Sequence, residues 1–232
     1  MMFDIFINFN ISCLQEKIAP TKRPNFPAPK KKYNKYTIPG RDGNFYEDTG
    51  YYEDIVVPIE FNYLCNENEW HSCFRRCKKL FLNTKTIQLS DDAEVYYKIK
   101  KIDIGTNERK AKRIGKFEVQ LTCDPYAYFI SGKDPISISE KITNIYDKTM
   151  PIYYIYGNGT CYLNVNGTDC KCNVTNCLII DTEKKLSYRE DGTLQNTAIN
   201  QDYDLLYLKE DDNTITLSDG FTLKVIPNWR CK

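Results

Sequence analysis

Histidine is almost absent from this chain: His71 is the only one among 232 residues. Imidazole is the commonest acid–base group near neutral pH and a frequent metal ligand. The sequence also lacks the Ser-His-Asp, Cys-His and HExxH arrangements that support nucleophilic or metal-dependent catalysis. We therefore expect a protein that is not an enzyme and that carries no cofactor or metal ion.

Long apolar runs and excess charge are missing too. No stretch of about 20 apolar residues occurs, so we expect no insertion in a membrane. The opening MMFDIFINFNIS lacks the basic start of a signal peptide, which argues against export. The net charge of +1 argues against a dedicated or sequence-specific nucleic-acid binder.

Cysteine, by contrast, is plentiful, with ten residues. Without an export signal, and with enough chain for an ordinary core, we expect free thiols that pack as small apolar side chains. Two clusters leave metal binding or a disulfide open as alternatives: HSCFRRC at residues 71–77 and CKCNVTNC at residues 170–177. Neither cluster has the paired spacing of a zinc finger or zinc ribbon.

Tyrosine dominates the aromatic content of the whole chain, with 18 residues against 11 phenylalanines, and the first part is rich in residues that favour β-structure. We expect strands at residues 3–9, Tyr33–Ile38, Ile55–Phe61, Thr86–Leu89, Val95–Ile104 and Arg113–Thr122. Pro58 inside one of these runs predicts an edge position or a bulge. Residues 16–32 are rich in lysine and proline, so we expect them to be extended or loop-like.

One helix is predicted, over Glu67–Leu82. Asn66 followed by Glu69 is typical of a capping box at its start. The apolar residues that recur on one helical face are Trp70, Cys73, Phe74, Cys77 and Phe81. The basic run at residues 75–79 lies on the other side, and we interpret it as a solvated face rather than a phosphate site.

Two features mark the end of this first half. TNERKAKRIG at residues 106–115 is a polar, basic connector that we expect to form a hairpin tip or an inserted loop. Asp124-Pro125 predicts a turn that ends the first half. We therefore divide the chain into a domain at residues 1–130 and a second domain at residues 131–232.

For the second half, the sequence predicts short strands and no helix. We expect them at Ile152–Tyr156, Cys161–Val165, Leu178–Asp181, Leu205–Leu208, Thr214–Leu217 and Phe221–Ile226. Asn-Gly and Asp-Gly pairs between these runs supply the positive φ angles of tight turns. This pattern is typical of a β-sandwich.

The stretch IPGRDGNFYEDTGYYEDIVV contains a charged pair between glycines, Gly40-Arg41-Asp42-Gly43. A phosphate loop would need glycines that lead into a helix, and no helix is predicted here. The order of the residues is not the adhesive Arg-Gly-Asp. We interpret the stretch as a tight turn from which Arg41 and Asp42 project.

The order of these features resembles the distal tail (Dit) proteins of long-tailed phages and related tail components of phages that infect Firmicutes. The resemblance starts from an initial strand, Ile38–Gly43, and a tyrosine-rich acidic segment that leads into a strand. It continues with one helix, a hairpin and KFEVQLTCDPY at residues 116–126, and it covers about residues 1–130. Ile152–Gly159, Asn166-Gly167 and Leu178–Asp181 match the family's C-terminal domain more loosely.

The resemblance implies a mainly β fold: an N-terminal ring-forming domain with one α-helix, and a C-terminal galectin-like β-sandwich. It implies a structural virion protein at the tail tip or baseplate, assembled in the host cytoplasm as a ring that is usually a hexamer. One face of the ring would meet the tail tube protein and the other the tail-associated lysin or hub, with DNA passing through the channel. The second domain would hold receptor-binding or other baseplate proteins. Gly40, Arg41, Asp42 and Gly43 then become candidate contacts between copies.

A competing hypothesis is a carbohydrate-binding module, in which the second domain recognises a host cell-wall glycan. Tyr153, Tyr154 and Tyr156 are the candidate sugar contacts, although strand alternation places at least one of them in the core. A wall hydrolase would need paired carboxylates or a metal cluster in a cleft, and the sequence gives no sign of either.

Overall fold

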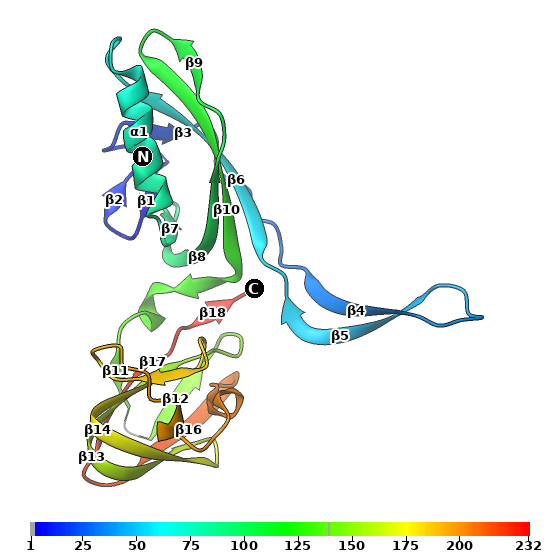
Figure 1. Ribbon diagram of the computed structural model, residues 1–232, viewed down its shortest axis with the longest axis vertical. Helices are drawn as coiled ribbons and strands as arrows, with labels where there is room; N and C mark the ends of the chain where they lie inside the picture. Colours follow the sequence, from blue (N-terminus) through cyan, green and yellow to red (C-terminus); the bar gives the residue numbers. More distant parts are fainter. Residues whose placement is uncertain (1–2, 139) are drawn as a thin grey trace. The chain divides into compact units, whose positions relative to one another are not determined.

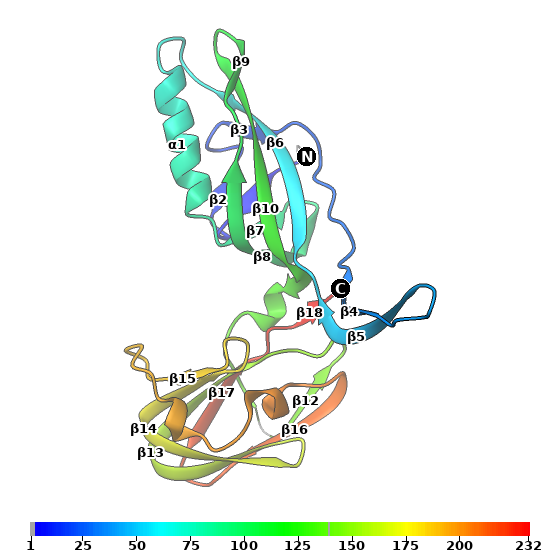
Figure 2. The ribbon, with the colours of Figure 1, turned by 45° about the vertical axis from the view of Figure 1, so that its right-hand side comes forward.

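The computed structural model describes residues 3–138 and 140–232. Contacts between residues divide the chain into two compact units, residues 1–127 with 232 and residues 128–231. We call these unit 1 and unit 2 and describe each by itself (Figures 1 and 2). The chain is mainly β, and α1 is the one α-helix of the described residues.

Unit 1 is built on one large sheet beside the helix. Its elements are β1 (Ile5–Ile7), β2 (Ile11–Ser12), β3 (Ile18–Pro20), β4 (Lys31–Thr37), β5 (Asn44–Tyr52), β6 (Ile55–Leu64), α1 (Trp70–Leu82), β7 (Thr86–Leu89), β8 (Asp92–Ile104), β9 (Glu108–Ala111) and β10 (Ile114–Phe129). The strand order is β2-β1-β7-β8-β10-β6-β3, and β9 pairs with β10. The strands β4 and β5 form a separate two-stranded sheet.

The core of unit 1 lies between this sheet and α1. Alternate residues of β6 are buried: Ile55, Val57, Ile59, Phe61 and Tyr63. From the helix, Cys73, Cys77 and Phe81 are buried, as the predicted apolar face requires. The ring centroid of Phe61 lies 4.8 Å from that of Phe81 and 5.7 Å from that of Phe117. These aromatic contacts fix the helix against the sheet.

The helix begins later than predicted, at Trp70. Its N-cap residue, Glu69, makes no side-chain cap hydrogen bond. Asn66 donates from Nδ2 to the Glu69 carboxylate at 2.8 Å. The predicted capping box was wrong because these two side chains bond to each other, whereas a capping box uses them to satisfy backbone N–H groups.

The predictions for Pro58 and for the Asp124-Pro125 pair have different outcomes. Pro58 pairs with Gln120 of β10, whereas β3 pairs only with residues 61–63 of β6. The predicted edge position is therefore confirmed. The predicted turn at Asp124-Pro125 was wrong, because β10 runs through it to Phe129. Pairing of β10 with β6 ends at Cys123, so the missing N–H of Pro125 costs no hydrogen bond of that ladder.

Two connecting segments of unit 1 hold more regular structure than expected. The basic connector at residues 106–115 forms the predicted hairpin tip, in which β9 pairs with the start of β10. The extended segment at residues 16–32 contains β3 and the first residues of β4. β9 and β3 are short strands that pair with a longer neighbour.

Unit 2 is dominated by a long hairpin. Its elements are η1 (Ile130–Gly132), β11 (Ile136–Ser137), β12 (Lys141–Asn144), β13 (Ile152–Val165), β14 (Thr168–Asp181), β15 (Leu186–Tyr188), η2 (Asn196–Ala198), η3 (Tyr203–Leu206), β16 (Asp211–Leu217), β17 (Thr222–Ile226) and β18 (Arg230–Cys231), where η marks a 3-10 turn. The main strand order is β11-β17-β13-β14-β15, and β16 pairs with β12 and β13. The buried face carries Tyr153, Ile155, Leu178, Ile180 and Val225.

The β13–β14 hairpin turns at Asn166-Gly167, as predicted. Both residues have positive φ angles, 53° and 85°, which a two-residue hairpin turn requires. Two predicted strands merge into β13, because pairing with β14 continues across Gly157 and Gly159. A Cβ at Gly157 would lie 2.4 Å from the Phe221 ring, so only glycine fits there.

One predicted strand of unit 2 was wrong. Leu205–Leu208 overlaps the 3-10 turn η3, although Leu206 and Leu208 are fully buried. A short apolar run indicates burial but does not decide between an extended and a helical backbone. The helical segments that the structure describes are all too short or too polar to cross a lipid bilayer.

Candidate assembly surface

The hairpin of β4 and β5, which we call the arm, pairs with none of the other described strands. Its register runs from Lys31 opposite Tyr52 to Thr37 opposite Asn44. It extends as a narrow ribbon from the sheet of unit 1 in both views (Figures 1 and 2). Every residue of β4 is exposed, and β5 is exposed except for two half-buried residues. The arm therefore has no core of its own.

The charged stretch between glycines forms the tip of the arm. Gly40 and Gly43 have φ angles of +78° and +80°, and a Cβ added at either would meet no atom. The conformation of these two positions therefore favours glycine, although space is not limiting. The backbone N–H of Arg41 donates to the carbonyl of Ile38 at 3.2 Å. The structure thus places the four candidate interface residues in an exposed turn, as the sequence predicted, and their role as contacts stays a prediction.

Aromatic rings cover both faces of the arm. By register, Tyr33 and Tyr46 lie on one face, with ring centroids 6.4 Å apart. Tyr36 and Phe45 lie on the other face, 6.3 Å apart. Each ring is 48–58% exposed. These exposed rings make the arm a candidate surface for contact with another molecule.

The two strands of the arm carry opposite charge. β4 has lysines at positions 31, 32 and 35, and β5 has Glu47 and Asp48. Lys31 Nζ lies 2.6 Å from Asp48 Oδ2, and this hydrogen bond lowers the pKa of Asp48 and raises that of Lys31. Tyr36 and Asn34 both donate to Glu47, at 3.0 and 3.3 Å. These cross-strand bonds hold the hairpin in register.

The base of the arm is fixed to unit 1. The N–H of Glu53 donates to the carbonyl of Lys30 at 2.8 Å, which brings the two ends of the arm together. The rings of Tyr52 and Tyr126 lie 6.0 Å apart. Next to them, Lys100 bridges Asp54 and Asp124, at 2.6 and 2.9 Å. The arm therefore starts from an ordered base, and its strands pair only with each other among the described strands.

The tyrosines proposed as sugar contacts lie on different faces of β13. Tyr153 is fully buried, and its hydroxyl donates to the carbonyl of Leu206 at 2.7 Å. Its assignment as a glycan contact was therefore wrong. Tyr154 and Tyr156 are half-buried on the opposite face, and Lys224 Nζ lies 6.0 Å from the ring centroid of Tyr156.

The two cysteine clusters do not converge in space. In the first, Cys73 and Cys77 are buried under α1, whereas His71 is exposed. In the second, Cys170 and Cys172 lie in the core with sulfur atoms 3.8 Å apart, and Cys177 lies on the opposite face of β14 by alternation. Burial raises the pKa of Cys77 and of Cys123 to about 12. Nine of the ten cysteines are buried, which fits the expected packing as small apolar side chains.

No family model and no curated protein sequence matches the chain. Its fold, however, has a solved counterpart. The chain is similar to the Dit protein (gp 19.1) of SPP1, described as a paradigm of the hub adsorption apparatus in phages that infect Gram-positive bacteria. The TM-score is 0.67 at 13% sequence identity, and the match covers 97% of this chain and 98% of that one. The predicted β-rich, Dit-like fold is therefore confirmed, over nearly the whole length of both chains.

The arm as a candidate site was only partly visible in the sequence. The turn and β4 were expected, but the segment from Asn44 to Tyr52 was interpreted as a tyrosine-rich acidic connector and not as a strand. Its aromatic residues were consequently missed: Phe45, Tyr46 and Tyr51. The available signal was the run of β-favouring aromatic residues directly after a glycine turn.

Proposed function

We propose that the chain is a structural protein of a phage tail tip that closes into a ring of about six copies. The observation that carries this proposal is the arm, an exposed two-stranded sheet with aromatic rings on both faces. A lone hairpin of this kind is marginally stable in water and is stabilised by packing on another surface. Rotational symmetry supplies that surface, because each copy then offers one arm and receives one.

The fold supports a place at the end of the tail. The SPP1 protein with this fold is described as part of a hub adsorption apparatus. On this basis the ring would join the tail tube protein to the tail-associated lysin or hub, and unit 2 would hold receptor-binding or other baseplate proteins. DNA would pass through the ring, and a net charge of +1 is compatible with a channel that does not hold phosphates tightly.

The proposal is tested by removing the arm. Because Glu53 and Lys30 are hydrogen-bonded at its base, residues 32–51 can be replaced by a short Gly-Ser link that keeps Tyr52 next to Tyr126. We expect the full chain to elute as a ring in size-exclusion chromatography with light scattering, and the armless chain to elute as a monomer. At dilutions where neither protein associates, the urea midpoint of unfolding should stay the same, because the outer arm adds no buried core. Equal masses for the two proteins would contradict the proposal.

A matched control replaces an exposed turn elsewhere. Residues 190–192 lie in a turn of unit 2 closed by a hydrogen bond from Arg189 N to Thr193 O at 3.0 Å. The same Gly-Ser link at this turn should leave the ring intact. Loss of assembly in the control as well would show that the effect is not specific to the arm.

A second candidate function is glycan binding by unit 2. The favouring observation is the row formed by Lys224, Tyr154 and Ile179 across β17, β13 and β14, with Tyr156 on the same face. Aromatic rings next to a polar group suit the faces and hydroxyls of a sugar. A glycan array probed with the full chain and with Tyr154→Ala tests this function. Binding that the substitution removes would support it, and an array without signal would exclude it.

A further inference from the structure

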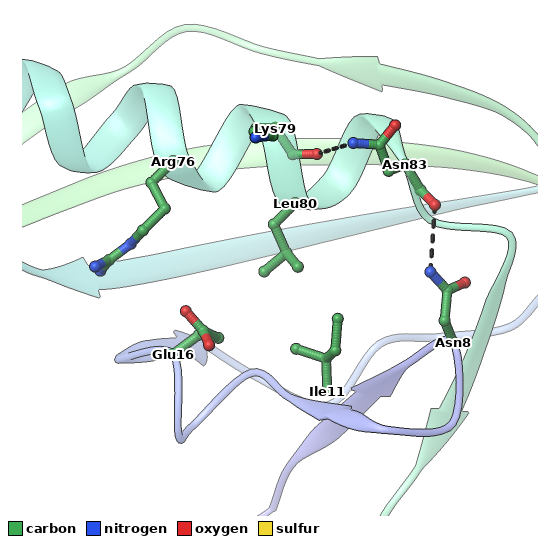
Figure 3. Close-up of a pocket in the computed structure, with 7 residues that line it drawn as sticks. All are labelled: Asn8, Ile11, Glu16, Arg76, Lys79, Leu80 and Asn83. Atoms are coloured by element: carbon green, nitrogen blue, oxygen red, sulfur yellow. Dashed lines mark hydrogen bonds between the residues drawn. The ribbon is translucent and has the colours of Figure 1, made fainter.

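Unit 1 contains a groove of about 340 Å³ between α1 and the N-terminal segment. The residues that line it are Asn8, Ile11, Glu16, Arg76, Lys79, Leu80 and Asn83. Leu80 points from the helix toward Ile11 of β2, and these two half-buried side chains form an apolar floor (Figure 3). The volume lies at the lower end of the ~300–1,000 Å³ typical of ligand pockets. The groove therefore has room for a large side chain.

One end of this groove is closed by hydrogen bonds. Asn8 Nδ2 donates to the carbonyl of Asn83 at 3.2 Å, and Asn83 Nδ2 donates to the carbonyl of Lys79 at 2.8 Å (Figure 3). The Asn8 side-chain oxygen accepts from the N–H of Lys85 at 2.7 Å. The side-chain amides of Asn8 and Asn83 are therefore bonded within the protein. The remaining lining residues can bind an occupant through apolar contact and charge.

The charge around the groove is mainly positive. α1 carries four basic side chains, at positions 75, 76, 78 and 79, and no acidic one. Arg76 and Lys79 line the groove, and Glu16 is the one carboxylate among its lining residues. An apolar group flanked by a carboxylate is therefore the complementary occupant.

One face of the arm carries apolar rings next to a carboxylate. By register, Tyr36 and Phe45 face each other, and Asn34 and Glu47 form the next pair on the same face. The hydroxyl of Tyr36 donates a hydrogen bond to the carboxylate of Glu47 at 3.0 Å. A carboxylate can accept further bonds, so Glu47 can still pair with a cation while its aromatic neighbours enter an apolar site.

We propose that the Tyr36–Phe45–Glu47 face of the arm docks in the α1 groove of a second copy of the chain. Phe45 packs on Leu80 and Ile11, and the carboxylate of Glu47 lies toward Arg76 and Lys79. Arm and groove are different surfaces, so the contact is head-to-tail, and repetition by rotation closes a ring. This inference rests on the proposed ring function and names the surface that each arm meets.

Photo-crosslinking tests the contact directly. p-Benzoylphenylalanine replaces Phe45 in the full chain, and a mixture of heavy- and light-isotope copies is irradiated. The expected product joins position 45 of one isotope form to a peptide of the other that contains Leu80 or Ile11. A crosslink that maps consistently to another segment, or that joins only copies of the same isotope form, overturns the proposal.

A charge exchange provides an independent test with a matched control. Glu47→Arg and Arg76→Glu should each weaken self-association by roughly tenfold or more, because each places like charges together. The double variant should recover most of the loss. Arg75→Glu makes the same charge change on α1 outside the groove and should leave association unchanged. Equal effects of Arg75→Glu and Arg76→Glu, or a double variant as weak as the worse single one, would overturn the groove assignment.

The two proposals fail in different ways. If removal of the arm disperses the ring but the groove variants and crosslinks give negative results, the ring function stands and the groove assignment is wrong. If the unmodified chain stays monomeric and the chain with p-benzoylphenylalanine at position 45 gives no crosslink between copies, both are overturned.

Discussion

The hydroxyl of Tyr153 donates a 2.7 Å hydrogen bond to the carbonyl of Leu206 inside the core of unit 2. Tyr153 lies on β13, whereas Leu206 ends the 3-10 turn η3. The bond therefore ties an irregular segment to the central hairpin. It also satisfies a carbonyl group on a residue that is fully buried.

Loss of this hydroxyl should destabilise unit 2. Tyr153→Phe leaves the Leu206 carbonyl without its partner in the core, and we expect a loss of about 1–3 kcal/mol in the free energy of unfolding. Tyr154→Phe is the control, because its side chain is half-buried on the opposite face of β13. Urea unfolding followed by circular dichroism measures both. Equal stability of the two variants would contradict the role of the bond.

Gly115 should tolerate no larger residue. A Cβ at this position would lie 2.1 Å from Cζ of Tyr63, which is itself buried and hydrogen-bonded to Asn107 at 2.9 Å. Gly115→Ala therefore forces the ring or the strand to move, at a cost of about 1–3 kcal/mol. In Gly105→Ala the nearest atom lies 3.4 Å away, so this control should be far milder. Thermal unfolding compares the two, and an unchanged Tm for Gly115→Ala would contradict the close contact.

Asp204 should give unit 2 a small pH-dependent stability. Its hydrogen bond from Lys185, followed by that from Tyr207, lowers the pKa of Asp204 below its ordinary 3.8. A lowered pKa means that the contribution is present above about pH 4 and is lost as the pH falls through the value in the folded protein. Because the Asp204 and Lys185 side chains are about half-exposed, the contribution of their ion pair is at most about 1 kcal/mol. The stability gap between the unmodified chain and Asp204→Asn should therefore be present at pH 7 and close in acid. A gap that widens in acid would contradict this sign.

The arm aromatics should matter for assembly and not for folding. Phe45→Ser and Tyr46→Ser change rings that are 50% and 58% exposed, so the free energy of unfolding of the dissociated chain should change by less than about 0.5 kcal/mol. Together they should weaken self-association at least roughly tenfold, since buried aromatic rings dominate protein interfaces. Tyr162→Ser, at a ring 52% exposed in unit 2, is the control. Light scattering over a dilution series checks the result, and equal association of all variants would contradict it.

Much of unit 1 was predictable, because its elements bury one face. The alternation in β6 and the spacing of Cys73, Cys77 and Phe81 on α1 are both signatures of packing against a core. The turn at Gly40–Gly43 was predictable for another reason: two glycines with positive φ angles mark a tight turn whatever surrounds it.

The arm and the irregular parts of unit 2 were harder to predict. β5 carries rings and carboxylates on both faces, so it lacks the alternation by which a half-buried strand is recognised. Its pattern is that of a strand without a buried face in its own copy, and we propose that the face with Phe45 is covered by another copy. Leu206 and Leu208 are fully buried, but the bonds that shape η3, such as the one from Tyr153, join distant residues and leave no local signal.

The central claim is that the chain forms a ring, and electron microscopy of the purified full chain tests it most directly. Negative-stain class averages, collected over a range of protein concentrations, show the number of copies and the presence of a central hole. Our account predicts closed rings of about six copies with a central hole. Single copies at every concentration, or open filaments without closure, would contradict it.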